Sequence, residues 1–187
     1  MDYETLLIDK KEGITTVTLN RPAKLNAMSE QMIQELVQLF TELRQDAVTR
    51  FVIFTGAGRA FSAGADVATL ADLGKDLTLA RMGQLLGHDF MRSLENLEQV
   101  TIAAVNGLAM GAGLSLAMAC DFRIASETAS FGIPEAAVGV FFTWGCTPRL
   151  TKLIGPAKAK ELIMTADPVD AKEALAIGLV NKVLPAD

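Results

Sequence analysis

Histidine and cysteine are scarce in this 187-residue chain, and their scarcity excludes several kinds of site. The one histidine, His88, and the two cysteines, Cys120 and Cys146, are too few for the usual four-ligand zinc site. Both cysteines lie in apolar stretches, which predicts buried thiols in a reducing compartment rather than a disulfide framework. We therefore expect neither a metal centre nor disulfide bonds.

Positive charge is also in short supply, with 17 lysines and arginines against 22 aspartates and glutamates. The resulting formal net charge of −5 argues against general binding to nucleic acid or to an anionic membrane surface. Half of the residues are hydrophobic, as in folded globular proteins. The chain has no linker, repeat or low-complexity segment, which predicts a single domain over residues 1–187.

Targeting signals are not evident at the N-terminus. A basic start followed by an apolar run is missing, so no secretory signal is predicted and a cytoplasmic location is expected. Residues 100–120 carry no charge and approach the length of a membrane span. The Asn106-Gly107 turn signal interrupts that run, which favours a buried strand followed by a buried helix.

The most informative segment is the glycine-rich stretch at residues 106–121. It follows a β-type run and opens an apolar helix, and its glycines keep side chains away from the junction. A ligand can therefore approach backbone N–H groups that the first turn of the helix leaves unpaired. Such a site suits negative charge that develops on a ligand oxygen during a reaction.

Two other interpretations of this stretch fail on residue type. A dinucleotide-binding fingerprint needs a third glycine, whereas Gly111 and Gly113 are followed by Leu114, Ser115 and Leu116. The segment around Ser115 also approaches the nucleophile elbow of serine hydrolases. That motif requires a histidine later in the chain, and His88 precedes it.

Apolar patterning divides the chain into alternating strands and helices. Short apolar runs bounded by turn residues predict strands at residues 5–9, 14–19, 51–55, 101–105, 122–125 and 179–184. Amphipathic stretches predict helices after an N-cap at Ser29, over residues 77–97, and over residues 150–164 with a break at Gly155-Pro156. Strands that alternate with helices indicate an α/β fold around a mostly parallel sheet.

Four segments in order carry a family resemblance. They are Asn20-Arg21-Pro22-Ala23-Lys24-Leu25-Asn26-Ala27, Arg59-Ala60-Phe61-Ser62-Ala63-Gly64-Ala65-Asp66-Val67, the stretch 106–121, and Phe131-Gly132-Ile133-Pro134-Glu135 with its continuation to Leu150. With these motifs the chain resembles the enoyl-CoA hydratase/isomerase family of the crotonase superfamily over essentially its whole length. The resemblance implies a spiral of repeated ββα units that binds an acyl-CoA thioester between the second and third segments.

The resemblance also implies the roles of individual residues. The N–H groups of Ala65 and Ala112 would form an oxyanion hole for a thioester enolate, and Glu135 would transfer the proton. Coenzyme A would be part of the substrate, with no separate cofactor. The residues implied in substrate binding are Lys24, Ala27, Ala63, Gly64, Ala65, Asp66, Val67, Leu108, Gly111, Ala112, Ser115, Pro134 and Glu135. Lys24 would lie near the CoA phosphates, although a solvated loop lysine explains it equally well.

One departure from the family pattern decides the expected reaction. Hydratases of the family carry a second glutamate where this chain has Ser115, and a serine does not readily take a proton from water at neutral pH. The sequence therefore favours double-bond isomerisation, which needs one base, over hydration. A non-catalytic acyl-CoA-binding homologue is the alternative from another class. Thr143 replaces the catalytic aspartate of dienoyl isomerases and dehalogenases in the family, which disfavours those activities.

Two further departures concern the surroundings of the site. Residues 141–144, Phe-Phe-Thr-Trp, replace a segment that is commonly smaller, and their aromatic rings either shape the acyl pocket or belong to the core. Family members continue with C-terminal helices that close the pocket and pack between subunits of a trimer or a dimer of trimers. This sequence ends at Asp187, so the expected fold lacks that helical region, and the expected homo-oligomer lacks its contacts.

Overall fold

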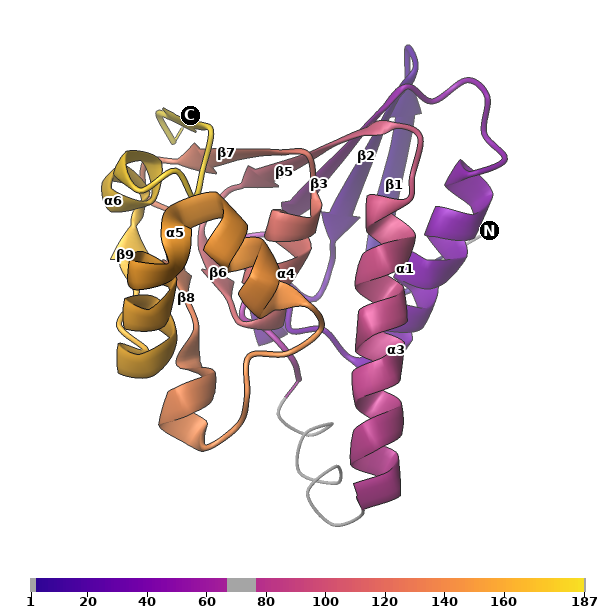
Figure 1. Cartoon of the computed structure of the whole chain (residues 1–187). Coiled ribbons are helices and arrows are strands. Elements are labelled where there is room, and N and C mark those ends of the chain that lie inside the picture. The colour runs from indigo at the N-terminus through magenta and orange to yellow at the C-terminus, as the bar shows by residue number, and fades with distance from the viewer. Residues whose placement is uncertain (1–2, 67–76, 187) are drawn as a thin grey trace.

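Two β-sheets organise the chain, with helices packed against them (Figure 1). The computed structural model describes residues 3–66 and 77–186. The larger sheet has six strands, in the order β1 (Leu6–Lys11), β2 (Ile14–Leu19), β3 (Phe51–Gly56), β5 (Val100–Val105), β7 (Phe122–Ser126) and β10 (Lys182–Leu184). β1 and β2 form an antiparallel hairpin, and every later neighbour pair in this sheet is parallel.

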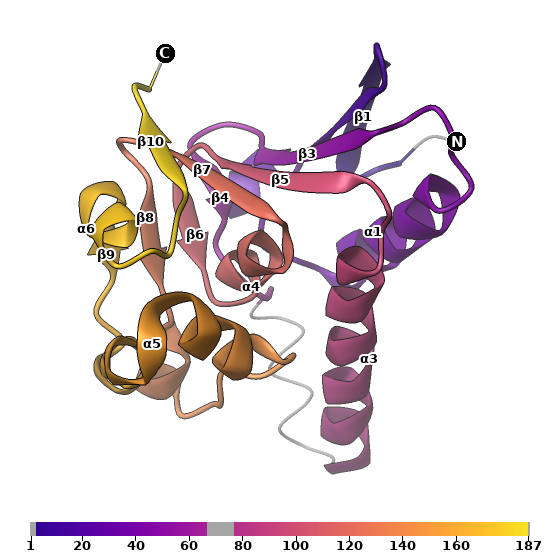
Figure 2. The ribbon, with the colours of Figure 1, turned by 45° about the horizontal axis from the view of Figure 1, so that its top comes forward.

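The smaller sheet has four short strands. Their order is β4 (Ala60–Ser62), β6 (Leu108–Met110), β8 (Ser130–Gly132) and β9 (Val169–Asp170). The β4–β6 and β6–β8 pairs are parallel, and β9 closes the sheet in the antiparallel direction. Figure 2 shows β6 and β8 running across the direction of β3 and β5, so the two sheets are set at a steep angle.

A repeating unit connects the two sheets. Three times the chain adds one strand to the six-stranded sheet, one strand to the four-stranded sheet, and then a helix. These helices are α3 (Leu77–Glu95), α4 (Ala112–Ala119) and α5 (Cys146–Thr165). The predicted α/β spiral of ββα units is therefore confirmed.

Helix boundaries follow local chemistry. Ser29 caps α1 (Glu30–Leu43), because its side-chain oxygen accepts a hydrogen bond from the N–H of Met32 at 3.2 Å. Gly155 breaks the helical path of α5 with φ 77° and ψ 161°, as the Gly-Pro signal predicted. The last elements are α6 (Ala171–Ala176) and β10, and no helix follows α6 in the described part of the chain.

The core lies between the helices and the inner face of the six-stranded sheet. Aromatic rings from α1, β3 and α3 meet there: Phe40 stands edge-on to Phe54 at 6.0 Å and stacks on Phe90 at 5.8 Å between ring centroids. α4 is buried on every side, and α3 and α5 both contact it. The first turn of α4 is therefore held firmly from all directions.

Four strands were not predicted from the sequence. The second family motif, residues 59–67, contains β4, and the glycine-rich stretch contains β6. β8 and β9 also lie outside the predicted strands. Two or three residues are too few to show the alternation of apolar and polar side chains by which strands are recognised. These short strands position the candidate site, because they fix the loops that meet at α4.

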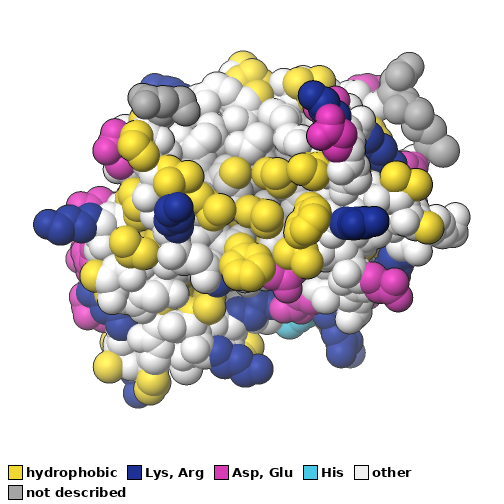
Figure 3. All heavy atoms as spheres, turned by 90° about the horizontal axis from the view of Figure 1, so that it is seen from above, with side chains coloured by type: hydrophobic (Ala, Val, Ile, Leu, Met, Phe, Trp, Pro, Cys, Tyr) yellow, Lys and Arg dark blue, Asp and Glu magenta, His cyan; other side chains and the backbone are white. Residues whose placement is uncertain are grey.

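The outer face of the six-stranded sheet carries apolar side chains. Ile14, Phe51 and Val100 are direct neighbours across β2, β3 and β5, and each is more than a third exposed. Figure 3 looks onto the molecule from above and shows hydrophobic side chains gathered in a band. Larger apolar patches of this kind often mark interaction surfaces.

The uncharged run at residues 100–120 folds as β5, β6 and α4. This confirms the interpretation as a buried strand followed by a buried helix. In residues 3–66 and 77–186, no helix combines the length and the apolar character needed to cross a membrane.

Candidate active site

The first part of the site is the loop that follows β4. The N–H of Met28 donates to the carbonyl of Gly64 at 2.8 Å, and the N–H of Asp66 donates to the carbonyl of Met28 at 3.0 Å. In a parallel pairing of this kind the residue between them, Ala65, directs its own N–H away from Met28. No acceptor within the described residues takes a hydrogen bond from the Ala65 N–H.

Gly64 allows this loop to approach the start of α4. Its φ of +102° lies in the region that favours glycine. A methyl group added at Gly64 would lie 3.0 Å from the carbonyl oxygen of Met110 and 3.6 Å from the N of Ala112. The Ala65 loop and the first turn of α4 are therefore in contact, and a side chain at position 64 would push them apart.

The second part of the site is the N-terminus of α4. Gly111 precedes the helix with φ 48° and ψ −115°, a backbone conformation that disfavours other residues. Ala112 is the first helical residue, so its N–H has no partner within the helix, and none elsewhere in the described chain. Two unpaired N–H groups, those of Ala65 and Ala112, thus lie at neighbouring backbone segments.

The third part is the Glu135 side chain, which comes from the 3-10 helix η2 (Pro134–Val138). A methyl group added at Gly111 would lie 2.7 Å from Glu135 Oε1, so the carboxyl group rests against the residue that precedes Ala112. Glu135 Oε2 is buried, and no hydrogen-bond partner for it is found in the described structure. Burial raises the pKa of Glu135 above its ordinary value, as a group that both takes and returns a proton requires.

A carboxyl group with one oxygen buried and without a partner makes stability depend on pH. Since folding raises the pKa of Glu135, its contribution to stability is present at low pH and is lost as the pH rises through the folded-state pKa. We expect Glu135→Gln to raise the thermal midpoint at about pH 8, with the difference shrinking toward about pH 4. Circular dichroism melts at both pH values measure this. A midpoint that falls at about pH 8 would show that the carboxylate is stabilised by its surroundings.

Ser115 lies one turn into α4 and is 2% exposed. Its hydroxyl donates to the carbonyl oxygen of Gly111 at 2.9 Å and lies 2.7 Å from the sulfur of Cys146, which donates to it. Cys146 is the first residue of α5 and is 1% exposed. The hydroxyl is therefore engaged with protein groups on two sides.

Both cysteines are free and buried. Burial raises the pKa of the Cys120 thiol to about 12 and that of the Cys146 thiol to about 11. The thiolate is the reactive form, so we expect both to react at least about 100-fold more slowly than a free thiol at pH 8. A chromogenic disulfide reagent should titrate two thiols only after unfolding. Rapid reaction of the native protein would contradict the burial of these side chains.

Arg21 and Asn26 hold the site loops, and the sequence interpretation gave them no such role. Arg21 pairs with Asp66 at 2.9 Å and also donates to the carbonyl oxygen of Ala27. Asn26 is fully buried and donates from its side chain to the carbonyl oxygens of Ala57 and Ala60. Burial and ion pairing cannot be seen in the sequence, so the place of both residues in the motif at residues 20–27 is the signal that could have identified them.

The other predicted residues lie at varying distances from this cluster. Ala63 and Leu108 are partly buried in the segments that meet at α4, and the N–H of Ala63 donates to the carbonyl oxygen of Leu25. Lys24 is exposed at the end of the 3-10 helix η1 (Pro22–Lys24), and Pro134 is exposed at the start of η2, next to Glu135. Val67 lies outside the described residues.

The aromatic segment before α5 divides between core and surface. Phe142 is buried, and the indole of Trp144 covers Gly87 of α3 and stands edge-on to Phe90 at 6.4 Å between ring centroids. Phe141 is 88% exposed. Phe142 therefore belongs to the core, and the partly buried Trp144 packs against it.

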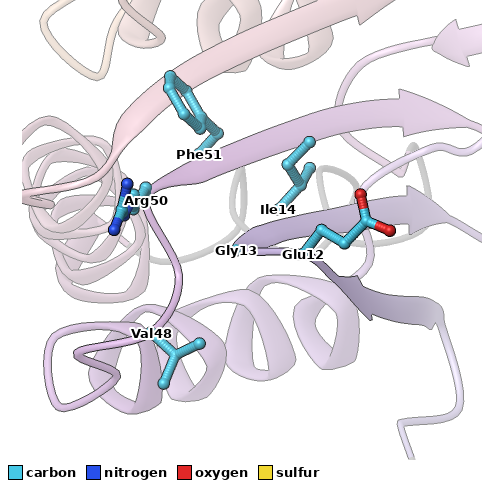
Figure 4. Close-up of a pocket in the computed structure, with 6 residues that line it drawn as sticks. All are labelled: Glu12, Gly13, Ile14, Val48, Arg50 and Phe51. Atoms are coloured by element: carbon cyan, nitrogen blue, oxygen red, sulfur yellow. The ribbon is translucent and has the colours of Figure 1, made fainter.

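A separate hollow of about 500 Å³ lies where the β1–β2 turn meets the start of β3 (Figure 4). Its lining residues are Glu12, Gly13, Ile14, Val48, Arg50 and Phe51. Ligands of open α/β sheets bind beyond the carboxyl ends of the strands, whereas this hollow lies at the amino ends of β2 and β3. The hollow is therefore a weaker candidate than the cluster around Glu135.

Comparison with known proteins gives a consistent result. A model of the enoyl-CoA hydratase/isomerase family matches residues 9–187. The crotonyl-CoA hydratase of Syntrophomonas wolfei is 42% identical over 185 residues, which cover 98% of this chain and 70% of that protein. The short-chain-enoyl-CoA hydratase of Clostridium acetobutylicum has the same identity and coverage.

Solved structures share the fold. DspI of Pseudomonas aeruginosa matches with a TM-score of 0.94 and 37% identity, covering all of this chain and 70% of that one. An enoyl-CoA hydratase from Bacillus anthracis matches with a TM-score of 0.92 and 39% identity, covering 98% of this chain and 71% of that one. The chain thus spans about 70% of the length of these relatives, and it belongs to the enoyl-CoA hydratase/isomerase family.

Proposed function

We propose that this chain binds an enoyl-CoA thioester and moves a proton at the carbon next to the thioester carbonyl. The N–H groups of Ala65 and Ala112 donate to the carbonyl oxygen as it becomes an enolate, and Glu135 transfers the proton. One observation carries the proposal: the buried Glu135 carboxyl group rests against Gly111, next to the unpaired N–H of Ala112.

The expected contributions to the rate support separate roles for the two backbone N–H donors and for Glu135. Fixed backbone donors aimed at an oxyanion contribute about 3–4 kcal/mol each to lowering the barrier. A positioned general base contributes about 10²–10⁴-fold in rate. The raised pKa of Glu135 suits proton transfer in both directions, because burial makes the protonated form of this carboxyl group easier to reach than in an exposed glutamate. Isomerisation moves protons and hydration adds water, and neither transfers electrons, so we expect no cofactor apart from the coenzyme A of the substrate.

Hydration of a 2-enoyl-CoA is the first candidate reaction. It rests on the names of two relatives that are 42% identical to this chain. Those names favour hydration over isomerisation, the reaction that we expected from the sequence. In this chain Glu135 would have to take a proton from water without help from Ser115, whose hydroxyl is engaged with Gly111 and Cys146. We therefore expect hydration to be slower than in a site with two carboxylates.

Isomerisation of a 3-enoyl-CoA is the second candidate, and a specific observation favours it. The side chain that occupies the second carboxylate's position is Ser115, which is too weak a base for this role. Isomerisation asks Glu135 to take one proton from C2 and return it at C4. A single carboxylate suffices for that exchange.

The test is to incubate the protein separately with a 2-enoyl-CoA and a 3-enoyl-CoA of the same chain length. Loss of the conjugated thioester's ultraviolet absorbance reports hydration of the first, and gain of the same absorbance reports isomerisation of the second. Turnover of either supports the enolate mechanism and assigns the reaction. Tight binding of both without turnover would favour the non-catalytic acyl-CoA-binding alternative.

Two partner interactions stay predictions. Lys24 is exposed and available for the phosphates of coenzyme A. Self-association, which the family resemblance implies, is supported by the exposed apolar band over β2, β3 and β5. Light scattering measures the oligomeric state directly, and a mass equal to one chain at all concentrations would contradict it.

A further inference from the structure

Cys146 is the one cysteine that contacts a predicted site residue, among the residues the structure describes. Its sulfur lies 2.7 Å from the hydroxyl of Ser115, and both side chains are almost fully buried. The same hydroxyl donates to Gly111, against which the Glu135 carboxyl group rests. A continuous line of contacts therefore runs from Glu135 through Gly111 and Ser115 to Cys146.

The position of Cys146 is fixed by its surroundings. It begins α5, and its N–H donates to the carbonyl oxygen of Thr143 at 2.9 Å. Arg149, one turn later, donates to the carbonyl oxygen of Trp144 at 2.7 Å and pairs with Glu95 of α3. Because the Trp144 ring is packed against Gly87, this corner of the chain is anchored to α3. The sulfur is therefore held against Ser115.

A larger side chain at position 115 would meet that sulfur. A glutamate has three more heavy atoms than a serine, and the hydroxyl oxygen is already in contact with Cys146 and with Gly111. Well-packed interiors have few voids larger than a water molecule, so an added carboxylate would need space that Cys146 occupies. A glutamate introduced here would also be desolvated with Glu135 nearby, which disfavours its charged form.

We propose that Cys146 is a specificity-determining residue. Its side chain occupies the space that a carboxylate at position 115 would need, so only a small, uncharged residue fits there. Glu135 is then the one carboxylate that serves the substrate. This inference rests on the proposed function, since it concerns which reaction the enolate site favours. Both residues must be changed to create a second carboxylate at this site. Changing Ser115 alone leaves Cys146 in the way, and changing Cys146 alone leaves a serine at position 115.

The experiment compares four proteins with the wild type: Ser115→Glu, Cys146→Gly, the double variant Ser115→Glu/Cys146→Gly, and the matched double variant Ser115→Glu/Cys146→Ser. The last one keeps the bulk at position 146 and so controls for loss of the thiol alone. For each we measure the ratio of the hydration rate to the isomerisation rate, and the thermal midpoint.

We expect the ratio to rise about 10²-fold in Ser115→Glu/Cys146→Gly, the lower end of what a general base contributes. Ser115→Glu alone and the matched double variant should show only a small part of that gain. Their thermal midpoints should fall further than that of the Cys146→Gly double variant. If Ser115→Glu alone does not fold and the Cys146→Gly double variant does, the same conclusion holds.

Three results would overturn the inference. One is a Ser115→Glu protein whose ratio rises as much as that of the Cys146→Gly double variant. Another is an equal rise in the matched double variant that carries a serine at position 146. The third is failure of Ser115→Glu to fold both alone and together with Cys146→Gly, because the obstacle would then lie elsewhere than in Cys146.

A separate assay distinguishes failure of this inference from failure of the proposed function. Exchange of the α-protons of a saturated acyl-CoA with D₂O requires Glu135 and the two N–H groups, and no second carboxylate. Exchange in every variant with an unchanged hydration ratio would reject the role of Cys146 alone. Lack of exchange in the wild type would reject the proposed function and, with it, the inference.

Discussion

Glu135→Gln is expected to lower turnover of enoyl-CoA by about 10²–10⁴-fold, because the amide cannot accept the proton that the carboxylate takes. The carboxyl group is buried against Gly111, and glutamine has nearly the same shape. The affinity for acyl-CoA should therefore stay within a few-fold. Initial rates and isothermal titration with a saturated acyl-CoA measure the two effects separately.

An exposed glutamate provides the control for this substitution. Glu127 lies in the exposed turn between β7 and β8, and Glu127→Gln should leave both rate and affinity unchanged. A Glu135→Gln protein with the wild-type rate would remove Glu135 from the mechanism. Equal loss of rate and affinity would point to a role in binding rather than in proton transfer.

Ala65→Pro is expected to lower turnover by about 10²–10³-fold, as removal of one oxyanion donor does in other enzymes. Proline lacks the N–H that Ala65 directs away from Met28. The hydrogen bonds that hold this loop belong to Met28, Gly64 and Asp66, so the substitution removes none of them. Steady-state rates of the folded variant, checked by circular dichroism, measure the loss.

Ala65→Gly is the matched control, since it keeps the N–H and removes only a methyl group. We expect it to retain most of the activity. Full activity in folded Ala65→Pro would show that the donor is not needed. Equal losses in the proline and glycine variants would instead mean that the Ala65 side chain or the loop conformation is what matters.

Much of the fold could be predicted because its long elements obey simple periodicities. The apolar run of β3 and the capped, amphipathic α1 were recognisable from residue type alone, as was the break at Gly155. The four short strands were not, since two or three residues carry no period. The resemblance to a known family supplied the ββα order that periodicity could not.

The sequence predicted which residues form the three parts of the candidate site, but not how those parts lie against one another. Spacing along the chain does not show that Glu135 rests against Gly111, because η2 and α4 lie in different ββα units. The contact between Ser115 and Cys146, which are 31 residues apart, is likewise a product of the fold. The ion pair between Asp66 and Arg21, which are 45 residues apart, is a third contact of this kind.

Family membership and residue chemistry give different weight to the two candidate reactions. The names of the 42% identical relatives favour hydration. Ser115 favours a reaction that one carboxylate can perform. The names belong to other proteins and take no account of the residue at position 115 of this chain. The substrate comparison described above decides between them, because each reaction changes the absorbance of the conjugated thioester in the opposite direction.

Exchange of α-protons with solvent tests the enolate mechanism most directly. The measurement follows deuterium entering a saturated acyl-CoA in D₂O by mass spectrometry, with the wild type beside Glu135→Gln and Ala65→Pro. We expect exchange by the wild type and a loss of about 10²-fold or more in both variants. Absence of exchange in the wild type, or an undiminished rate in Glu135→Gln, would contradict it.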